Sequence, residues 1–281
     1  MLPLSHLTQA AADALAFLRA QEDVEEAEAF VAANGVLHAR LNYTSHIPCN
    51  GVEEPKSSEN FGIGVQAVFK AGDDELRRIG FGSETSDISL EGVKSALDKA
   101  RKGAVADPEF YSLARPTGER RLLAAYHDPQ LMDIADADLV DAGWRVVSGA
   151  LRAFQTSESL ASIAADPDAL RDLGLIVGGD VTILQERMAI ASSAMPEVRT
   201  DESTLIMSFI TSMVEREGSK GSGYEAATQL NAFSDEAGRQ AAQNAIASIG
   251  GLRVKDGGYR VVFGRQAVMD ILVNLVMPSL S

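Results

Sequence analysis

Hydrophobic and polar positions repeat with two different periods along this chain, and the two periods predict helices and strands. Between Leu7 and Ala20 the apolar residues fall at helical spacing, whereas from Glu26 to Asn42 apolar and polar residues largely alternate. The first pattern predicts a helix and the second predicts β-strand. Asn34-Gly35 interrupts the alternating run. Because this pair readily adopts two positive φ angles, it predicts a type I′ turn and therefore a β-hairpin.

A second hairpin is predicted over residues 62–83, where a polar turn at 71–75 separates two alternating runs. Residues 43–59 are rich in Pro, Ser, Asn and Glu and predict a loop. Ser89 is placed to cap a helix over residues 90–105, whose apolar residues form one stripe and whose last turns carry Lys and Arg. These elements predict an N-terminal hairpin-and-helix unit.

The second part of the chain repeats this rhythm of strands and helices. A strand is predicted at 120–127, a helix at 137–154, and three strands at 173–179, 181–192 and 203–217, with a turn at Gly178–Asp180. A helix capped by Ser234 follows at 234–251, then a strand at 258–264 and a terminal apolar helix. The predicted fold class is α+β, with a second α/β unit containing a mixed or antiparallel sheet. The predicted domains are residues 1–106, a linker at 107–119, a middle domain at 120–257 and the start of a C-terminal domain at 258–281.

Composition and charge restrict the classes of function. The formal net charge is −15, which repels phosphate backbones and anionic lipids, so nucleic acid and membrane surfaces are not expected partners. No apolar run approaches the roughly 20 residues that a membrane-spanning helix needs. The single cysteine, Cys49, excludes a disulfide within the chain and fits a reducing compartment. A cytoplasmic location is therefore expected.

Two glycine-rich stretches are candidates for phosphate binding. Gly62–Ala67 (GIGVQA) matches the opening of a dinucleotide fingerprint, but it leads into a strand-like run instead of a helix, so we interpret it as the start of a strand. Gly218–Glu225 (GSKGSGYE) has no apolar helix directly behind it, and a phosphate cradle needs that helix. We therefore interpret it as a loop between a strand and a helix.

The other candidate chemistry is sparse. The histidines (His6, His38, His46 and His127) are scattered, and only His46 lies close to Cys49, three residues away. A structural zinc site usually has four protein ligands, and no second pair accompanies these two. No GxSxG motif marks a nucleophile. The residues alone therefore indicate no catalytic or metal-binding residue, and they leave the substrate-binding residues unknown.

One resemblance extends along nearly the whole chain. The stretches GIGVQAVF, RRIGFGSETSDISLEGVKSALDKARKGA, DPEF, MAIASSAM, GSGYE and DEAGRQAAQNAIASIGGLRVKDGGYRVVFGRQAV follow one another in an order that resembles the TldD/PmbA family. This is a metallopeptidase-related family once called modulators of DNA gyrase. The resemblance implies a partner-dependent protease. In the family, one type of subunit carries a helix with HExxxH, which holds zinc and positions a glutamate to activate water.

In this chain the corresponding helix reads AVMDILVNLVMPSLS, and no histidine follows His127. The expected ligand positions hold Val273, Asn274, Leu275, Val276, Met277 and Pro278. The segment therefore resembles the PmbA-like, or TldE-like, branch, which lacks the metal motif. That resemblance implies no cofactor in this chain, zinc in a TldD-like partner subunit, and unfolded peptide as substrate. Self-association is the alternative to a hetero-oligomer.

Two further expectations concern the chain's end and its role. Family members continue well beyond this helix, so Ser281 is expected to be an artificial or processed end, with a naturally short variant as the alternative. The expected role is a non-metal subunit that contributes scaffold and peptide binding, and this chain alone is expected to be catalytically inactive. The alternative role is a non-enzymatic interaction or regulatory module that has kept the family scaffold. Regulation of a DNA topoisomerase rests only on the older family name.

Overall fold

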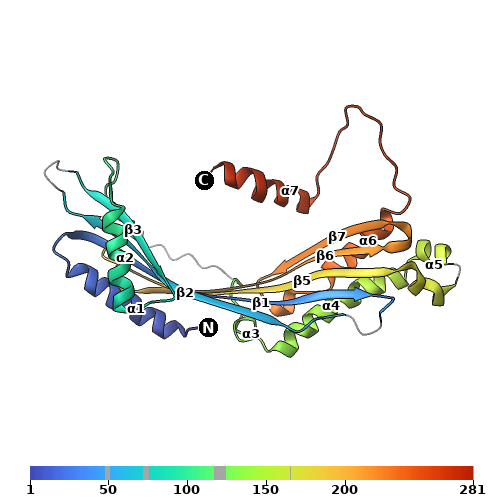
Figure 1. Cartoon of the computed structure of the whole chain (residues 1–281), viewed down its shortest axis with the longest axis horizontal. Helices are drawn as coiled ribbons and strands as arrows, with labels where there is room; N and C mark the ends of the chain where they lie inside the picture. The colour runs from blue at the N-terminus through green and yellow to red at the C-terminus, as the bar shows by residue number, and fades with distance from the viewer. Residues whose placement is uncertain (48–50, 72–75, 117–124, 165, 281) are drawn as a thin grey trace.

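The structure is a computed structural model, which describes the chain except for residues 48–50, 72–75, 117–124, 165 and 281. The described residues form one seven-stranded antiparallel sheet with the order β4-β3-β2-β1-β5-β6-β7. Helices pack on one face of this sheet, which curves away from them at both ends (Figure 1). The α+β class predicted from the sequence is therefore confirmed.

The strands and helices have the following bounds. The strands are β1 (Val24–Thr44), β2 (Lys56–Phe69), β3 (Arg78–Thr85), β4 (Val105–Ala106), β5 (Leu175–Ser192), β6 (Arg199–Val214) and β7 (Ser219–Ala227). The α-helices are α1 (Leu4–Arg19), α2 (Leu90–Lys102), α3 (Pro129–Met132), α4 (Asp136–Gln155), α5 (Glu158–Ala164), α6 (Glu236–Ala247) and α7 (Arg265–Ile271). Short helical turns are η1 (Pro167–Leu173), η2 (Glu215–Glu217), η3 (Leu230–Ala232), η4 (Leu272–Val276) and η5 (Met277–Ser279).

The sheet joins two units that have the same order of principal elements. The first unit runs α1-β1-β2-β3-α2 and the second runs α4-β5-β6-β7-α6. Their first strands, β1 and β5, pair antiparallel along Glu28–Thr44, so the strand order reads outward from this pair in both directions. The two ends of the sheet are therefore built alike, with a third strand and a helix packed against it.

The predicted hairpin at Asn34-Gly35 is wrong, because β1 runs through this pair without a turn. Asn34 lies opposite Asn60 of β2 on one side and Glu186 of β5 on the other. A strand paired along both edges satisfies its backbone hydrogen bonds, and this tertiary pairing overrides the local preference of Asn-Gly for a turn.

Three other predictions from local pattern are also wrong. The expected turn at Gly178–Asp180 lies inside the continuous strand β5. Gly179 lets the backbones of β5 and β6 approach closely there, because a Cβ atom on it would lie 2.1 Å from the carbonyl oxygen of Phe209 in β6. The expected loop at Gly218–Glu225 is largely the edge strand β7, and residues 258–264 form no strand.

Several other elements agree with the sequence prediction. The β2–β3 hairpin and the helices at α1, α2, α4 and α6 are confirmed. Ser89 caps α2 by accepting a hydrogen bond from the backbone N–H of Gly92. At α6 the N-cap is Asp235 instead of Ser234, although the Ser234 hydroxyl accepts a bond from the N–H of Glu236. The expected strand at 120–127 falls mostly outside the described residues.

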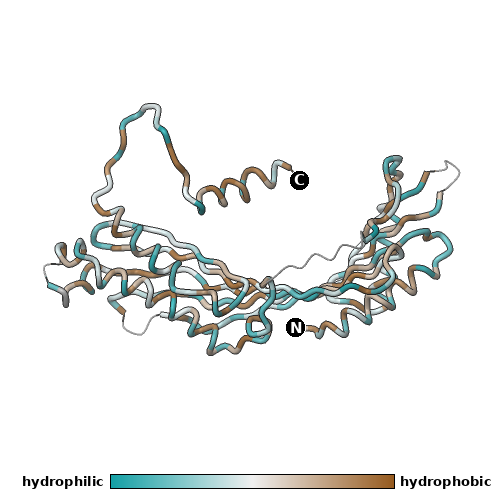
Figure 2. The backbone as a smooth tube through the Cα atoms, turned by 180° about the vertical axis from the view of Figure 1, so that it is seen from behind, coloured by the Kyte–Doolittle hydropathy of each residue, from teal (hydrophilic) through white to brown (hydrophobic). Residues whose placement is uncertain are grey.

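The hydrophobic core lies between the sheet and its helices in two clusters. One cluster gathers under α1 and α2, with Leu7, Leu18 and Leu97 fully buried or nearly so. The other gathers under α4 and α6, around Phe154 and Phe233. Apolar and polar stretches follow each other along the whole backbone, and the segment after α6 extends over the other face of the sheet (Figure 2). No described helix is both long and apolar enough to cross a membrane.

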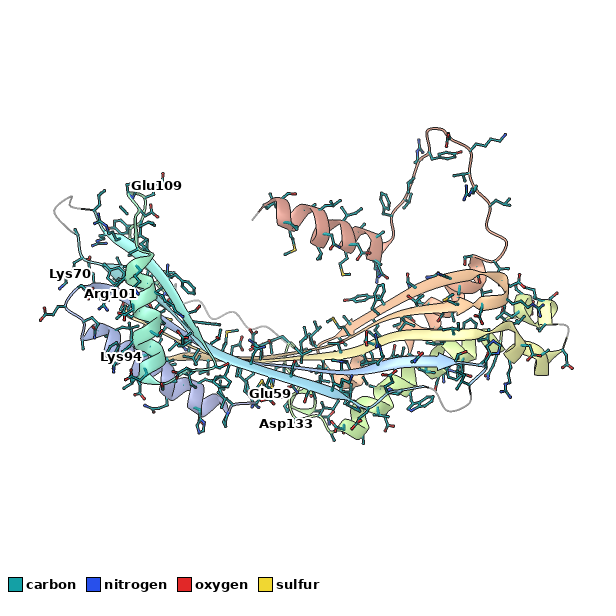
Figure 3. All side chains as sticks on the ribbon, viewed as in Figure 1. Glu59, Lys70, Lys94, Arg101, Glu109 and Asp133 are labelled. Carbon is teal, nitrogen blue, oxygen red and sulfur yellow. The ribbon has the colours of Figure 1, made fainter. Side chains whose placement is uncertain are left out.

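An ion pair joins the turn before β1 to the end of α2, where Figure 3 labels Arg101. The Arg101 guanidinium donates two hydrogen bonds to the Asp23 carboxylate, at 2.8 and 3.0 Å. These bonds hold the pKa of Asp23 below its ordinary value of 3.8, so the pair stabilises the fold above about pH 4 and is lost on further acidification.

Replacing Asp23 with asparagine is therefore expected to cost about 0.5 kcal/mol at pH 7, because the pair is partly exposed. The cost should vanish as the pH falls through the folded-state pKa of Asp23. Urea unfolding of both proteins at pH 7 and pH 3 measures this difference. An equal cost at both pH values would contradict the assignment.

Candidate functional site

The face of the sheet opposite the helices is the candidate site, and we call it the open face. Side chains alternate between the two faces of a strand, so residues 28, 30, 32, 34, 36, 38 and 40 of β1 point to the open face. Three phenylalanines on it are large and exposed, with 38% of Phe30, 66% of Phe81 and 51% of Phe209 accessible. Such a surface can contact an apolar partner or ligand.

A hollow of about 380 Å³ lies at the centre of this face. Its apolar side is one cross-strand row in which Val36, Leu184 and Leu205 lie opposite one another on β1, β5 and β6. The next row is polar, and Ser203 donates a 3.1 Å hydrogen bond to Glu186 in it. The hollow can therefore take an aliphatic side chain beside a hydrogen-bonding group.

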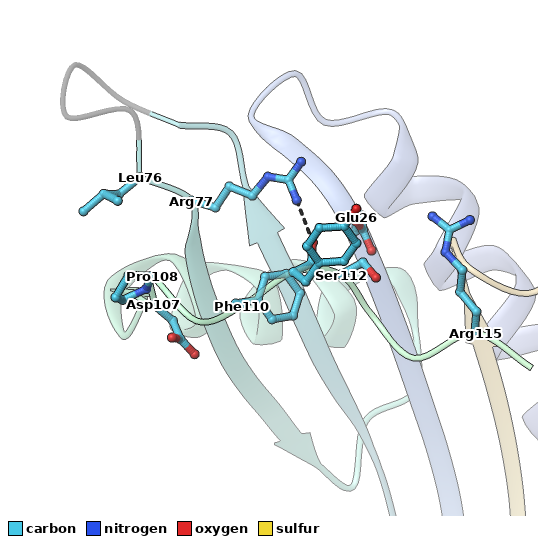
Figure 4. Close-up of a pocket in the computed structure, with 9 residues that line it drawn as sticks. Glu26, Leu76, Arg77, Asp107, Pro108, Phe110, Ser112 and Arg115 are labelled. Carbon is cyan, nitrogen blue, oxygen red and sulfur yellow. Dashed lines mark hydrogen bonds between the residues drawn. The ribbon is translucent and has the colours of Figure 1, made fainter.

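A second pocket of about 620 Å³ lies where β3 begins and β4 ends (Figure 4). Arg77 spans it by donating to the carbonyl of Tyr111 at 2.9 Å and to the carboxylate of Glu25 at 2.7 Å. The N–H of Leu113 donates to Glu26 at 2.9 Å, which fastens the segment after β4 to β1. The Tyr111 side chain is 88% exposed at the rim of this pocket.

The scattered histidines do not come together as a metal site within the described part of the chain. His46 lies 3.5 Å from a carboxylate oxygen of Glu215, while Cys49 falls outside the described residues. Among the described residues, no three His, Cys, Asp or Glu side chains are grouped to hold a metal ion.

The two glycine-rich candidates are both strand segments. Gly62–Ala67 lies within β2, as predicted, so its glycines do not open a helix N-terminus. Gly221 and Gly223 lie in β7, where the backbone of α6 approaches closely, and this packing explains the glycines without a phosphate. The open face was not predicted from the sequence, although the alternation of side chains in β1, β5 and β6 was the signal that could have revealed it.

The segment that resembles the family's metal helix begins as α7 and continues as η4 and η5. All side chains from residue 273 to 278 are exposed, and they include no imidazole, thiolate or carboxylate. Asn274 donates to the carbonyl of Asp270 one turn earlier.

One part of the chain matches a known protein family by sequence. Residues 50–104 match the sequence model described as PmbA/TldA metallopeptidase domain 1. The chain therefore carries a domain of the TldD/PmbA family. This stretch covers the β2–β3 hairpin and α2, and the resemblance stated from the sequence is confirmed.

Two solved structures have a similar fold. TldE from Thermococcus kodakarensis matches 85% of this chain with a TM-score of 0.60 and 15% identity. A putative modulator of DNA gyrase from Bacteroides thetaiotaomicron matches 89% with a TM-score of 0.58 and 13% identity. The chain matches 47% and 51% of these two proteins, so it spans about half their length. No curated protein matches the chain.

Proposed function

We propose that this chain is the non-metal, TldE-like subunit of a heteromeric zinc peptidase that acts on unfolded peptides. The observation that carries the proposal is the set of side chains at residues 273–278, the positions where the resemblance to the family leads us to expect the zinc ligands of a metal-bearing subunit. Valine, leucine and proline side chains offer no lone pair to zinc, and the stretch contains no histidine, cysteine or carboxylate, so we assign the metal to a TldD-like partner.

The open face supports a role of this chain in binding the peptide substrate. It presents exposed aromatic rings and a hollow with one apolar and one polar row, and both features suit extended peptide of variable sequence. The zinc of the partner would supply the activated water, while this chain would hold and orient the peptide. Its net charge of −15 favours a partner or substrate that is not strongly acidic.

The proposal is tested by reconstituting the chain with a TldD-like subunit that carries HExxxH and measuring cleavage of an unfolded peptide. Cleavage is expected only when both proteins are present. A histidine-to-alanine change in the partner's motif should abolish it, because that change removes a zinc ligand.

Two results would contradict this assignment. Cleavage by this chain alone would place the chemistry on it, and equal cleavage by the partner alone would leave it no role in peptide hydrolysis. Stable complex formation without any gain in cleavage would instead favour the interaction module.

A further inference from the structure

The third strands of the two units, β3 and β7, have equivalent surroundings, and the two-residue strand β4 lies beside only the start of β3. Each contains Gly-x-Gly packed on the backbone of a helix. A Cβ atom on Gly82 would lie 2.0 Å from the carbonyl oxygen of Ala96, and one on Gly223 would lie 2.0 Å from that of Ala237. These contacts relate α2 to α6 and β3 to β7 by a constant offset of 141 residues (223 − 82 and 237 − 96).

At the β7 edge, three polar side chains of α6 and its C-cap each bond one outward backbone group of the strand. Gln240 accepts from the N–H of Tyr224 at 3.2 Å, Asn244 donates to the carbonyl of Ser222 at 2.8 Å, and Ser248 donates to the carbonyl of Lys220 at 3.0 Å. We call these three side chains the α6 ladder. Their spacing of four residues is about 6 Å along a helix, which nearly matches two residues along a strand.

At the β3 edge, most of this protection is missing. Lys99, the equivalent of Gln240, donates to the carbonyl of Ser83 at 2.8 Å. The equivalent of Asn244 is Gly103, which has no side chain, and β4 pairs only with Arg78 and Ile79.

The free groups of this edge can be assigned from the strand's alternation. The N–H of Ser86 donates to the carbonyl of Phe61 in β2. The backbone N–H and C=O groups of the even-numbered residues of β3 therefore point toward β2, and those of Phe81 and Ser83 point away from it. Within the described residues, the N–H groups of Phe81 and Ser83 and the carbonyl of Phe81 have no hydrogen-bond partner. An unprotected outer edge of this kind is a template for another strand.

We propose that an extended peptide segment adds to the sheet at the β3 edge along Phe81–Thr85, and that the α6 ladder excludes it from the β7 edge. This proposal deepens the proposed function, on which it rests for the class of ligand, by placing the unfolded peptide on one edge. Backbone hydrogen bonds hold such a ligand with little demand on its sequence. The exposed Phe81 ring gives an apolar contact for a side chain that the added strand presents on the open face.

The first test uses this chain alone and a short fluorescent peptide of alternating valine and threonine with a lysine at each end. Hydrogen exchange is expected to show new protection of the Phe81 and Ser83 amides when the peptide binds. The Ser83→Pro variant removes only an outward N–H and should weaken binding about tenfold. The matched variant Ser222→Pro at the covered edge should bind like the wild type.

The second test opens the covered edge. The double variant Gln240→Ala, Asn244→Ala removes two rungs of the α6 ladder, and the number of bound peptides should rise from one to two. No binding to the wild type, protection at β7, self-pairing of β3 between two copies, or equal loss in both proline variants would overturn the proposal. These measurements need neither zinc nor a partner subunit, so their failure is separate from failure of the proposed peptidase role.

Discussion

Replacing Gly238 with alanine is expected to lower the free energy of unfolding by about 3 kcal/mol. Gly238 lies in α6 where this helix crosses α4, and an added Cβ would lie 1.9 Å from the carbonyl oxygen of Val146. The obstacle is backbone, so the two helices would have to separate and open the core around Phe154. This cost should exceed the gain of about 1 kcal/mol that alanine brings to a helix.

The matched control is Gly103→Ala at the end of α2. The nearest atom to a Cβ there is the carbonyl oxygen of Lys99 at 3.4 Å, so stability should change by less than about 0.5 kcal/mol. Urea unfolding of both variants measures the difference. Similar stability of the two variants would show that α4 and α6 do not cross as closely as the structure has them.

Replacing Asp128 with alanine is expected to destabilise the fold by about 3 kcal/mol. Its carboxylate is nearly buried and accepts from the N–H of Gln130 at 2.9 Å and from that of Leu230 at 2.8 Å. The Asp128 N–H donates to Thr204 of β6, so this residue joins three segments that are distant in sequence. Removing the carboxylate would leave two backbone donors without a partner.

Asp133→Ala is the matched control for this variant. The Asp133 side chain is 82% exposed and lies 4.0 Å from Arg187, so its loss should cost less than about 0.5 kcal/mol. Thermal unfolding of both variants tests the contrast. A small effect at Asp128 would mean that water or another group replaces its two hydrogen bonds.

The helices α1, α2, α4 and α6 were predictable from the sequence because each has its own local pattern. In α4 and α2 the apolar residues recur on one stripe, and this period does not depend on the rest of the chain. The β2–β3 hairpin was predictable for a similar reason, since its strands are neighbours in sequence.

The strands at the centre of the sheet were not predictable in this way. Asn34-Gly35 has the composition of a turn, and pairing with β2 on one side and with β5, some 150 residues away, on the other keeps it extended. The rhythm of strands and helices in the two halves was visible, but the residue-by-residue correspondence of the two units was not, because the stretches around Gly80-x-Gly82 and Gly221-x-Gly223 share little beyond these glycines. Both features depend on contacts between distant segments.

The candidate site was even less accessible from the sequence. The resemblance along nearly the whole chain indicated a family, but the rows of side chains on the open face require the register of β1 against β5 and of β5 against β6. The α6 ladder joins residues of a helix to an edge strand that was predicted to be a loop. Taken one at a time, the residues of these rows and of the α6 ladder have no distinctive chemistry that a sequence pattern could reveal.

The most direct measurement of the central claim is native mass spectrometry with metal analysis, on this chain alone and after co-expression with an HExxxH-bearing family subunit. We predict a heteromeric complex that retains zinc, whereas this chain purified alone should retain none. Zinc bound stoichiometrically by this chain alone, or no complex between the two proteins, would contradict the assignment as a non-metal peptidase subunit.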